Sequence, residues 1–294
     1  MRGFLNINFL KNLQRYRACR AGLVCLLIIL LIVPPIFAGQ TKSKERYVVS
    51  AKSAIFSDST KVKRLYGKNV HSKVLPASTT KVMTALLVLE KLSLDQTVTV
   101  SSRATQTQPS KIYLKPGEKF KVSDLLYATL LSSANDASVV LAEAVAGSEW
   151  NFVQMMNARA RQLGATHTKF SNSHGLPSKK VRQYTTAYDM YLIFREALKH
   201  DFFRKAIKFK YKVIYSRVNG GTGRKIALKS HNKILFKNWA KNIYGKTGYT
   251  RGAQSCFVGT LNKGESTLII VVFGCSRRWD DIKHIVSTYG GIVL

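Results

Sequence analysis

Two side chains that together can do chemistry stand three positions apart at the start of the stretch PASTTKVMTALLVLE, residues 76–90. Ser78 and Lys81 fall on one face of a helix, so the amine can reach the hydroxyl. The residues after Lys81 are apolar, and loss of water favours the neutral amine, which can accept a proton. A serine hydroxyl is a weak nucleophile without such a base. The pair therefore predicts a nucleophile and its base, unless Ser78 only caps the helix and Lys81 faces solvent.

A second motif, Ser133-Ala134-Asn135, lies between two runs of helical periodicity. A loop at that place can direct both polar side chains into a cleft. We expect Ser133 to carry a proton between Lys81 and a leaving amine, and Asn135 to hold the amide of the substrate. The alternative for Asn135 is a plain N-cap of the helix that follows.

A third motif, Lys246-Thr247-Gly248, is expected on a strand. Neighbouring side chains of a strand point to opposite faces, so Thr247 can meet a substrate carboxylate while Lys246 faces the other way. Gly248 lets a substrate backbone come close to the strand. The N–H group of Tyr249 can complete an oxyanion hole with that of Ser78, because donors fixed at this point stabilise developing negative charge.

Each motif by itself is a weak signal, and the chain contains its own control. The stretch SHNK, residues 230–233, also has a serine three positions before a lysine and two before an asparagine. No helical run follows it, so we interpret it as a loop. The other three motifs gain weight because they occur together, in order and each in a fitting structural context.

The order and spacing of the three motifs resemble those of the penicillin-recognising serine enzymes. Within them the chain is most similar to the low-molecular-weight penicillin-binding proteins, the D-alanyl-D-alanine carboxypeptidase family. The similarity runs from about residue 47 to residue 281 and is carried by the stretches PASTTKVMTALLVLE, LLSSANDAS, NSHGLP, YTTAYDM and GKTGYT. Ala134 departs by one methyl from the glycine that the family usually has between its serine and asparagine.

The resemblance implies a reaction and a set of partners. It implies cleavage of the terminal D-alanyl-D-alanine bond of peptidoglycan stem peptides through an acyl-enzyme on Ser78, without metal or cofactor. It also implies that β-lactam antibiotics bind. The same residues would serve a DD-endopeptidase that cuts cross-links between stems, so the two activities are not separated by the sequence. A catalytically inactive polyanion-binding protein would not need the complete set of catalytic side chains.

A β-lactamase is the third enzymatic alternative. The β-lactamases with this motif spacing use a glutamate, on a loop between the second and third motifs, to activate water. Residues 165–186 contain no Asp or Glu, which argues against rapid hydrolysis of the acyl group.

Some other polar residues are assigned supporting roles. Arg277 or Arg278, just past the last expected strand, can pair with the terminal carboxylate of a substrate. His174 matches the family loop and is expected to shape the cleft, and Asp136 to order the loop at Asn135. The six histidines show no metal-ligand spacing with cysteine or acid.

The beginning of the chain predicts export. Residues 1–20 are basic without an acid, and residues 21–33 are apolar throughout. At about 1.5 Å per residue this run is shorter than the roughly 30 Å hydrocarbon core of a bilayer. Residues 1–38 are therefore predicted to be a signal peptide with cleavage near Ala38, or an uncleaved N-terminal anchor. Residues 39–294 would form the catalytic domain, in the periplasm or at the outer face of the cytoplasmic membrane.

The charge balance is strongly positive. The chain has 47 Lys and Arg against 15 Asp and Glu, a formal net charge of +32. Such a field favours polyanions, so an anionic membrane or wall polymer is a candidate partner. A general excess of lysine selects no partner, however, and we expect no specific nucleic acid.

Strands are expected at both ends of the exported chain and helices between them. Residues 46–70 read as two strands with a turn at 57–60, and the regions 208–229 and 242–275 as further strands. Residues 122–200 have mostly helical periodicity, with helix ends at Gly147 and Gly164. This predicts an α+β fold of the β-lactamase/DD-peptidase type. One antiparallel sheet of N- and C-terminal strands would be flanked by helices, with an all-helical lobe inserted between them.

Two cysteines outside the leader, Cys256 and Cys275, lie on two expected strands joined at residues 262–264. Pairing Leu261 with Ser266 separates the two cysteines by about four positions along the ladder. That is roughly 13 Å, beyond the reach of a disulfide. We therefore expect two free thiols.

Overall fold

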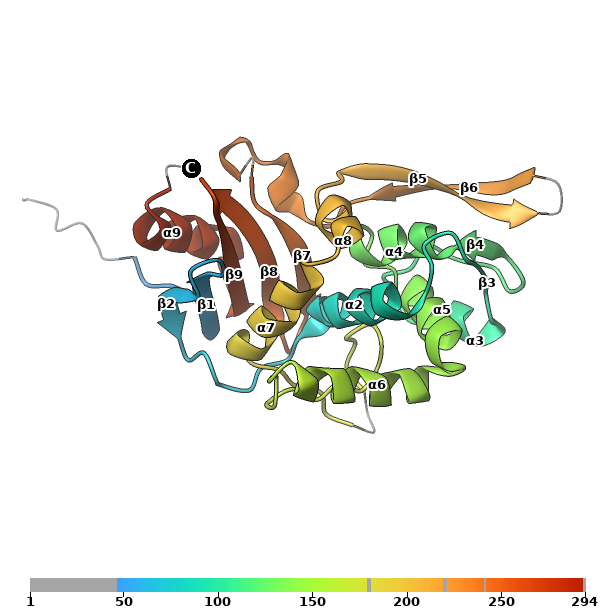
Figure 1. Ribbon diagram of the computed structural model, residues 1–294, viewed down its shortest axis with the longest axis horizontal. Coiled ribbons are helices and arrows are strands. Elements are labelled where there is room, and N and C mark those ends of the chain that lie inside the picture. Colours follow the sequence, from blue (N-terminus) through green and yellow to red (C-terminus); the bar gives the residue numbers. More distant parts are fainter. Residues whose placement is uncertain (1–46, 179–180, 219–220, 241, 293–294) are drawn as a thin grey trace, which may run out of the picture. The chain divides into compact units, whose positions relative to one another are not determined.

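A five-stranded antiparallel sheet is built from both ends of the described chain (Figure 1). The structure is a computed structural model and describes residues 47–178, 181–218, 221–240 and 242–292. The sheet has the order β2-β1-β9-β8-β7. Its strands are β1 (Ser53–Asp58), β2 (Lys63–Lys68), β7 (Tyr244–Thr250), β8 (Gln254–Lys263) and β9 (Ser266–Cys275). The predicted sheet of sequence-distant strands is confirmed, because β1 pairs with β9 from Ser53–Phe273 to Asp58–Leu268.

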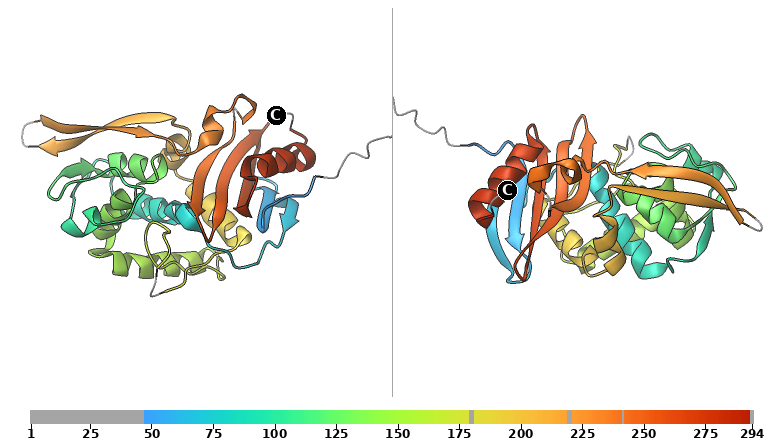
Figure 2. Two further views of the ribbon diagram at one scale, coloured as in Figure 1. Left: turned by 180° about the vertical axis from the view of Figure 1, so that it is seen from behind. Right: turned by 90° about the horizontal axis from the view of Figure 1, so that it is seen from above.

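The two faces of this sheet are covered by different helices. Helix α9 (Arg278–Gly290) packs on one face and α7 (Ala187–Ala197) on the other (Figure 2). All six residues of β1 and most of β9 are buried, as expected for strands with a helix packed on each face of the sheet. The edge strand β2 is largely exposed and has lysines at both of its ends, a charge placement that discourages pairing with another chain.

A helical lobe adjoins the sheet and has α2 (Lys81–Lys91) at its centre (Figure 1). The first eight residues of α2 are all buried, because four helices surround it. These are α4 (Val122–Leu130), α5 (Asn135–Ala146), α6 (Glu149–Gln162) and α7. The predicted helix ends are confirmed: Gly147 caps α5 in the left-handed region and Gly164 follows α6 with a φ of +79°.

The lobe is not all-helical, which corrects one part of the sequence prediction. A second sheet has the order β3-β4-β5-β6. It consists of β3 (Thr97–Thr99), β4 (Lys119–Lys121), β5 (Tyr211–Val218) and β6 (Gly221–Lys229). The hairpin of β5 and β6 was expected to join the main sheet, and β3 and β4 were not expected at all. Strands of three residues are too short to show an alternating pattern. The α+β class itself is confirmed.

The register between β8 and β9 also differs from the prediction. Leu261 pairs with Leu268 and Lys263 with Ser266, so the turn is the two residues Gly264 and Glu265. Gly264 has a φ of +55°, the conformation that a two-residue hairpin turn requires and a side chain disfavours. The predicted turn at 262–264 was therefore misplaced by about two residues.

The two thiols are nevertheless free, for a different reason than separation along the ladder. Ser255, the neighbour of Cys256, pairs directly with Cys275. Cys256 belongs to the core cluster beneath the helical lobe, whereas the Cys275 side chain hydrogen-bonds Asp281 of α9. The two thiols thus lie on opposite faces of the sheet, where no disulfide can join them.

The predicted leader, residues 1–38, lies outside the described residues. Within the part of the chain that is described, none of the helices combines the length and apolar character needed to cross a membrane.

Candidate active site

Ser78 and Lys81 meet where a short 3-10 helix runs into α2. Ser78 lies in η1 (Ala77–Thr80), and Lys81 is the first residue of α2. The Nζ atom of Lys81 lies 3.2 Å from the Oγ atom of Ser78. The Lys81 residue has no exposed surface, and no side chain caps η1 or α2. The two structural alternatives considered for this pair, a capping serine and a solvated lysine, are therefore wrong.

The surroundings of Lys81 suit a neutral amine. Its Nζ atom donates to Oδ1 of Asn135 at 2.6 Å and to the carbonyl oxygen of His174 at 2.8 Å. A neutral amine has two N–H donors and one lone pair, so the lone pair is left for the hydroxyl hydrogen of Ser78. Burial lowers the pKa of Lys81 well below its usual value, and the charge of Lys246 lowers it further. The arrangement is that of a base hydrogen-bonded to a nucleophile.

Ser133 and Lys246 form a second hydrogen-bonded pair across the pocket. Ser133 lies in the loop between α4 and α5 and has a φ of +56°, a conformation that costs a non-glycine residue energy. Lys246 of β7 donates from Nζ to the Ser133 Oγ atom at 2.9 Å and to the Thr247 carbonyl oxygen at 3.0 Å. Burial, and secondarily the charge of Arg278, lowers the pKa of Lys246 to about 7.

Asn135 is not the N-cap of the helix that it begins. Ala134 occupies the N-cap position of α5, without a side-chain hydrogen bond. The Asn135 side chain instead accepts from Lys81 and donates from Nδ2 to the carbonyl oxygen of Gln108 at 2.7 Å. The neighbouring Asp136 is buried and accepts from the backbone N–H groups of Ile112 and Leu114. Asp136 therefore fixes the segment at residues 112–114 against the start of α5, whereas the sequence predicted a role in ordering the loop at Asn135.

Strand β7 lies directly against the turn that holds the nucleophile. A Cβ atom added to Gly248 would stand 3.0 Å from the Ser78 nitrogen and 3.1 Å from the Cβ atom of Ala77. A Cβ atom on Gly175 would stand 1.9 Å from the carbonyl oxygen of Ala77. Ala77 has a φ of +47°. Two glycines from distant segments thus leave the space for a strained turn that presents Ser78.

These residues surround one pocket of about 260 Å³. Its lining residues are Ser78, Ser110, Ser133, His231, Thr247, Gly248, Tyr249 and Arg278. The structure therefore brings all eight sequence-predicted site residues together. Five of them line the pocket. The other three, which are hydrogen-bonded to residues of this site, are Lys81, Asn135 and Lys246. No acidic side chain is among the described lining residues, so the pocket suits an anionic ligand.

The structure separates the two candidate arginines. Arg278 lines the pocket and donates from Nη1 to the carbonyl oxygens of Gly248 at 3.2 Å and Cys256 at 2.9 Å. Its buried Nε atom has no hydrogen-bond partner within the described part of the chain. Arg277 is exposed and donates to the carbonyl oxygen of Val48. Only Arg278 is in position to meet a carboxylate in the pocket.

Ser110 and His231 line the pocket but were missed by the sequence interpretation. Ser110 carries no motif; its carbonyl oxygen accepts from the Asn135 N–H group at 2.8 Å. His231 belongs to the SHNK stretch that was set aside as a loop. The stretch is indeed a loop leading into η2 (Lys233–Phe236), but it is a loop beside the pocket. Partial desolvation, together with the charges of Lys246 and Lys81, lowers the pKa of His231 to about 4.

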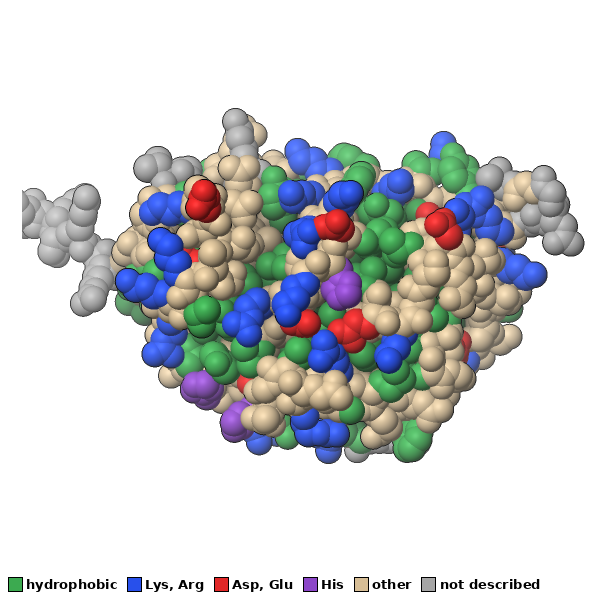
Figure 3. Space-filling model, viewed as in Figure 1, with side chains coloured by type: hydrophobic (Ala, Val, Ile, Leu, Met, Phe, Trp, Pro, Cys, Tyr) green, Lys and Arg blue, Asp and Glu red, His purple; other side chains and the backbone are tan. Residues whose placement is uncertain are grey.

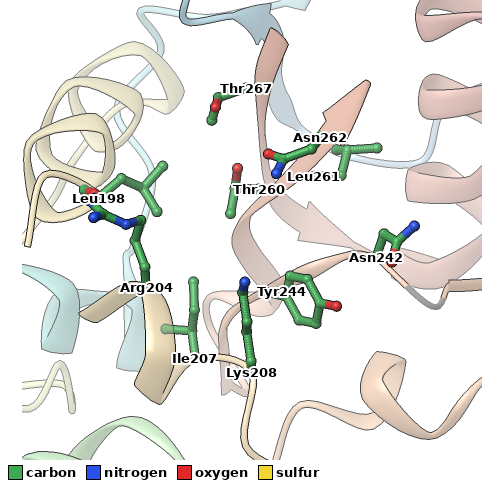
Figure 4. A pocket seen from close by; sticks show the side chains of 10 residues that line it. All are labelled: Leu198, Arg204, Ile207, Lys208, Asn242, Tyr244, Thr260, Leu261, Asn262 and Thr267. Atoms are coloured by element: carbon green, nitrogen blue, oxygen red, sulfur yellow. Dashed lines mark hydrogen bonds between the residues drawn. The ribbon is translucent and has the colours of Figure 1, made fainter. Parts of the chain in front are cut away.

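A second cavity of about 600 Å³ lies between the region of α8 (Asp201–Ala206) and the β7–β9 end of the main sheet (Figure 4). Arg204, Lys208 and Tyr244 contribute to its wall, and the Lys208 ammonium lies 5.2 Å from the ring centre of Tyr244. The three sequence motifs do not contribute to this cavity. Among the described residues there is also no cluster of three His, Cys, Asp or Glu side chains able to hold a metal ion.

Comparison with known proteins agrees with this geometry. Residues 39–277 match the D-alanyl-D-alanine carboxypeptidase family. The chain is 36% identical over 257 residues to D-alanyl-D-alanine carboxypeptidase DacF of Bacillus subtilis, covering 85% of this chain and 64% of that protein. It is 35% identical over 258 residues to D-alanyl-D-alanine carboxypeptidase DacC of Escherichia coli, covering 83% and 61%. The chain thus spans less than two thirds of these two curated relatives.

Solved structures give the same result. A point mutant of a Streptomyces DD-transpeptidase superposes with a TM-score of 0.78 at 26% identity, over 84% of this chain and all of that one. The D-alanyl-D-alanine carboxypeptidase structure from Mycobacterium tuberculosis superposes with a TM-score of 0.75 at 28% identity, over 84% and 94%. With the motifs in one pocket and most of its length matched, the chain belongs to the D-alanyl-D-alanine carboxypeptidase family.

Proposed function

We propose that this chain is a serine DD-peptidase that removes the terminal D-alanine from peptidoglycan stem peptides through an acyl-enzyme on Ser78. Lys81 takes the hydroxyl proton of Ser78 as the Oγ atom attacks the penultimate D-alanine carbonyl carbon. The backbone N–H groups of Ser78 and Tyr249 stabilise the negative charge that develops on the carbonyl oxygen. The peptide C–N bond then breaks, and the proton held by Lys81 must reach the leaving nitrogen.

Ser133 is the proposed path for that proton. Its Oγ atom lines the catalytic pocket and accepts a hydrogen bond from Lys246 Nζ at 2.9 Å. A hydroxyl group can accept a proton on one side and donate one on the other, so it transfers the proton without a net change. A water molecule later takes the place of the leaving amine, attacks the ester of Ser78 and restores the free enzyme.

The cationic end of the pocket would hold the terminal carboxylate of the substrate. Thr247 and Arg278 line this end, with the buried Lys246 behind them. The guanidinium of Arg278, which lines the pocket, supplies the positive charge that such a carboxylate would meet. Asn135, placed beside Lys81, would hold the amide of the acyl part.

One observation carries this proposal: a fully buried lysine amine in contact with a pocket-lining serine. Lys81 Nζ has two carbonyl acceptors and one hydroxyl within 3.2 Å, and burial lowers the pKa of Lys81 well below its usual value, which favours the neutral amine. A lysine retained only for structure would be expected to find a carboxylate or to reach solvent.

Slow release of a penicillin acyl group is also expected. No acid lines the described catalytic pocket. Glu149 has a carboxylate beside the 172–174 loop. This carboxylate accepts hydrogen bonds from the N–H and hydroxyl groups of Ser173 at 3.0 and 2.8 Å. Rapid deacylation needs a carboxylate that can activate water. This supports a penicillin-binding peptidase over a β-lactamase.

Export belongs to the same proposal. A peptidase for peptidoglycan works outside the cytoplasm, and residues 1–38 have the composition of a signal peptide or N-terminal anchor. The enzyme would act in the periplasm or at the outer face of the cytoplasmic membrane, with residues 39–294 as its catalytic domain. Lys and Arg side chains are scattered over much of the face shown in Figure 3 and form no single patch. An anionic membrane or wall polymer as a partner is therefore proposed from the net charge alone.

Intact-mass spectrometry after incubation with penicillin tests the nucleophile. We expect the wild-type chain to gain one penicillin mass, mapped to Ser78 and stable for hours. Ser78→Ala should gain none while retaining the thermal unfolding transition of the wild type. Release of free D-alanine from a stem pentapeptide, measured on the same samples, tests the activity. An adduct lost within seconds would favour a β-lactamase, and a folded wild type without adduct or D-alanine release would contradict the proposal.

A further inference from the structure

The carboxylate of Glu149 contacts the same loop as the catalytic lysine. Glu149 is the first residue of α6, and its side chain is 13% exposed. Lys81 donates from Nζ to the carbonyl oxygen of His174 at 2.8 Å, and Glu149 contacts both Ser173 and His174. A buried charge costs free energy unless it is paired and hydrogen-bonded. The partners of this carboxylate therefore indicate what it does.

The loop at residues 172–175 depends on side chains for its conformation. These residues form no backbone–backbone hydrogen bond with another described residue. From α2, Thr84 donates from Oγ1 to the carbonyl oxygen of Ser173 at 2.5 Å. From α6, Glu149 accepts from the N–H and hydroxyl groups of Ser173 at 3.0 and 2.8 Å. Ser173 is thus fixed from two sides, and Glu149 supplies one of them.

The ring of His174 faces the same carboxylate. Its Nδ1 atom accepts from the N–H group of Leu176 at 3.2 Å, so the hydrogen of the neutral ring is on Nε2. The Nε2 atom lies 3.7 Å from Oε1 of Glu149. Burial, and secondarily the charge of Lys81, lowers the pKa of His174 to about 4, so the ring is neutral at physiological pH. The carboxylate attracts the Nε2–H group and favours this orientation of the ring.

The loop supplies one of the two carbonyl oxygens that fix the Lys81 amine. The other belongs to the Asn135 side chain, which is itself held by the carbonyl oxygen of Gln108 at 2.7 Å. With both acceptors in place, Nζ lies 3.2 Å from the Ser78 Oγ atom. A displaced His174 carbonyl would leave the amine free to turn away from the hydroxyl group. A misplacement of about 1 Å near the reacting atoms can cost about a hundredfold in rate.

We propose that Glu149 is a positioning residue for acylation. Acting through Ser173 and His174, it holds the amine of the catalytic lysine against the nucleophile. Glu149 is not among the described residues that line the catalytic pocket, so it exchanges no proton with the substrate. Its effect is to keep the 172–175 loop against the amine, so that the acceptor stays in place and water stays out. The inference rests on the proposed function, because Lys81 is a base only in that reaction.

Other titratable groups also interact with the Lys81 amine, namely Lys246, Asp136, His174 and His231. Burial is the main cause of the lowered pKa of Lys81; the charge of Lys246 on β7 lowers it further, and that of Asp136 on α5 raises it. Of these four groups, His174 is the one that contacts Glu149 in the described part of the chain. A substitution at Glu149 is therefore expected to change the titration of Lys81 through the loop.

Stopped-flow acylation by penicillin across pH 5–9 tests this role, with the thermal unfolding of each protein measured beside it. Glu149→Ala removes the acceptor of Ser173. Glu149→Gln removes the charge but keeps a carbonyl oxygen that can accept from Ser173. The rate and the rising limb of the pH profile, where Lys81 loses its charge, are compared between the two variants and the wild type.

Glu143 provides the matched control, as Glu143→Ala and Glu143→Gln. Its side chain is 17% exposed, accepts from the Ser101 hydroxyl at 2.6 Å and lies 3.9 Å from Arg103. The Arg103 guanidinium also contacts Glu149, at 3.4 Å. The hydrogen bonds and ion pairs of Glu143 within the described residues do not include the 172–175 loop. The control variants therefore lose the same charge and a comparable buried contact.

In Glu149→Ala we expect kcat/KM to fall about tenfold to a hundredfold, because the acceptor of the base is displaced. The rising limb should also move to higher pH, because water that reaches the amine raises its pKa from the value that burial has lowered. Glu149→Gln should restore most of the rate and the position of the limb. The controls should stay within about twofold of the wild type with an unmoved limb, since they leave the loop intact.

Two outcomes would overturn the positioning role while leaving the DD-peptidase in place. One is a wild-type rate and limb in Glu149→Ala. The other is a lower rate with an unmoved limb, which loss of stability alone would produce. If Glu149→Ala does not fold, Ser173→Ala removes the hydroxyl contact to Glu149 and should shift the limb in the same direction by a smaller amount; an unchanged profile there would contradict the role. A folded wild type that forms no penicillin adduct would instead refute the proposed function, and the inference with it.

Discussion

The Nζ atom of Lys246 lies 2.9 Å from the Oγ atom of Ser133, and both residues are buried. This contact joins strand β7 of the main sheet to the loop before α5 in the helical lobe. It also sets an ammonium group with a pKa of about 7 beside the proposed proton path. Charge at the centre of the site therefore changes within the physiological pH range.

The first prediction concerns the pH dependence of acylation. Lys81 must be neutral to accept a proton, so kcat/KM for penicillin should rise with pH as that amine, with its lowered pKa, loses its charge. Lys246 must be charged to attract the carboxylate, so kcat/KM should fall again above about pH 7. Because the charges of Lys81 and Lys246 interact, the apparent pKa values of the rising and falling limbs of this pH profile describe the two amines together. Stopped-flow acylation of the wild type across pH 5–9 measures both limbs.

Lys246→Arg is the control for that assignment. A guanidinium stays charged over the whole range, so the alkaline limb should move out of it even if the rate is lower throughout. If the alkaline limb of Lys246→Arg stayed at the wild-type pH, the fall in kcat/KM would come from the titration of another group.

The second prediction concerns stability. The pKa of Lys246 is lowered from 10.5 to about 7 in the folded chain, so between these values the unfolded chain binds more protons. The free energy of unfolding then rises with pH across this window, by at most about 1.4 kcal/mol per pH unit from this group. Below about pH 7 both states are protonated and the contribution is constant.

Urea unfolding of the wild type and of Lys246→Met at pH 7, 8, 9 and 10 measures this contribution as a difference. Groups that do not sense the charge of Lys246 cancel in that difference, whereas Lys81 and His231, whose pKa values that charge lowers, still contribute to it. A gap between the two proteins that does not change in favour of the wild type as pH rises would contradict a depressed pKa.

The third prediction concerns the base. Lys81→Ala removes the amine that contacts Ser78, Asn135 and His174. We expect penicillin acylation to fall by at least about a thousandfold, since the serine loses its base. Intact-mass spectrometry over hours measures the rate, and circular dichroism verifies the fold. Normal acylation by a folded variant would remove Lys81 from the mechanism.

The fourth prediction separates two neighbouring arginines. Arg278 lines the pocket, and Arg277 is exposed outside it. Arg278→Ala should raise KM for a stem pentapeptide about tenfold to a hundredfold, because a charged hydrogen bond is worth roughly 1.5–3 kcal/mol. Arg277→Ala is the matched control and should leave KM within about twofold. Equal effects from both substitutions would mean that net charge, not the contact, is responsible.

The fifth prediction concerns the glycine of the third motif. In Gly248→Ala the new Cβ atom would press on the Ser78 nitrogen at 3.0 Å. We expect a loss of about 1–3 kcal/mol in the free energy of unfolding and a strong loss of acylation, because the turn must shift. Gly221→Ala is the control: it meets nothing within 4 Å and should leave both measurements nearly unchanged. Acylation at the wild-type rate in Gly248→Ala would show that the close approach is not required.

The sequence was most informative where side-chain type and spacing act over short distances. Ser78 and Lys81 are one helical turn apart, so their contact follows from local geometry alone. The strands β8 and β9 were visible from their β-branched residues and β1 from Ile55 and Phe56, and the helix ends were visible from Gly147 and Gly164. Pairing between distant strands was predicted in outline, since strands at both ends of a chain complete one sheet.

Other features depend on tertiary packing that no local pattern encodes. Strand β3 pairs with β4, and β4 pairs in turn with β5 of the β5–β6 hairpin. Both strands depend on this pairing, because three residues are too few to show an alternating pattern. The β8–β9 register depends on the turn conformation of Gly264. His231 reaches the pocket because its loop attaches to Leu131. Whether Arg277 or Arg278 reaches the pocket depends on the residue at which α9 begins. Sequence patterns do not locate a helix end to within one residue.

The place of β1 in the main sheet has a consequence for how the protein is made. This strand, near the start of the described chain, lies between β2 and β9, and its partner β9 is synthesised about two hundred residues later. Until β9 arrives, β1 and β8 each present an unpaired hydrophobic edge. A chain cut short before β9 would therefore expose two aggregation-prone edges at once. Productive folding must wait for nearly the whole polypeptide, which favours slow folding and a need for protection in transit.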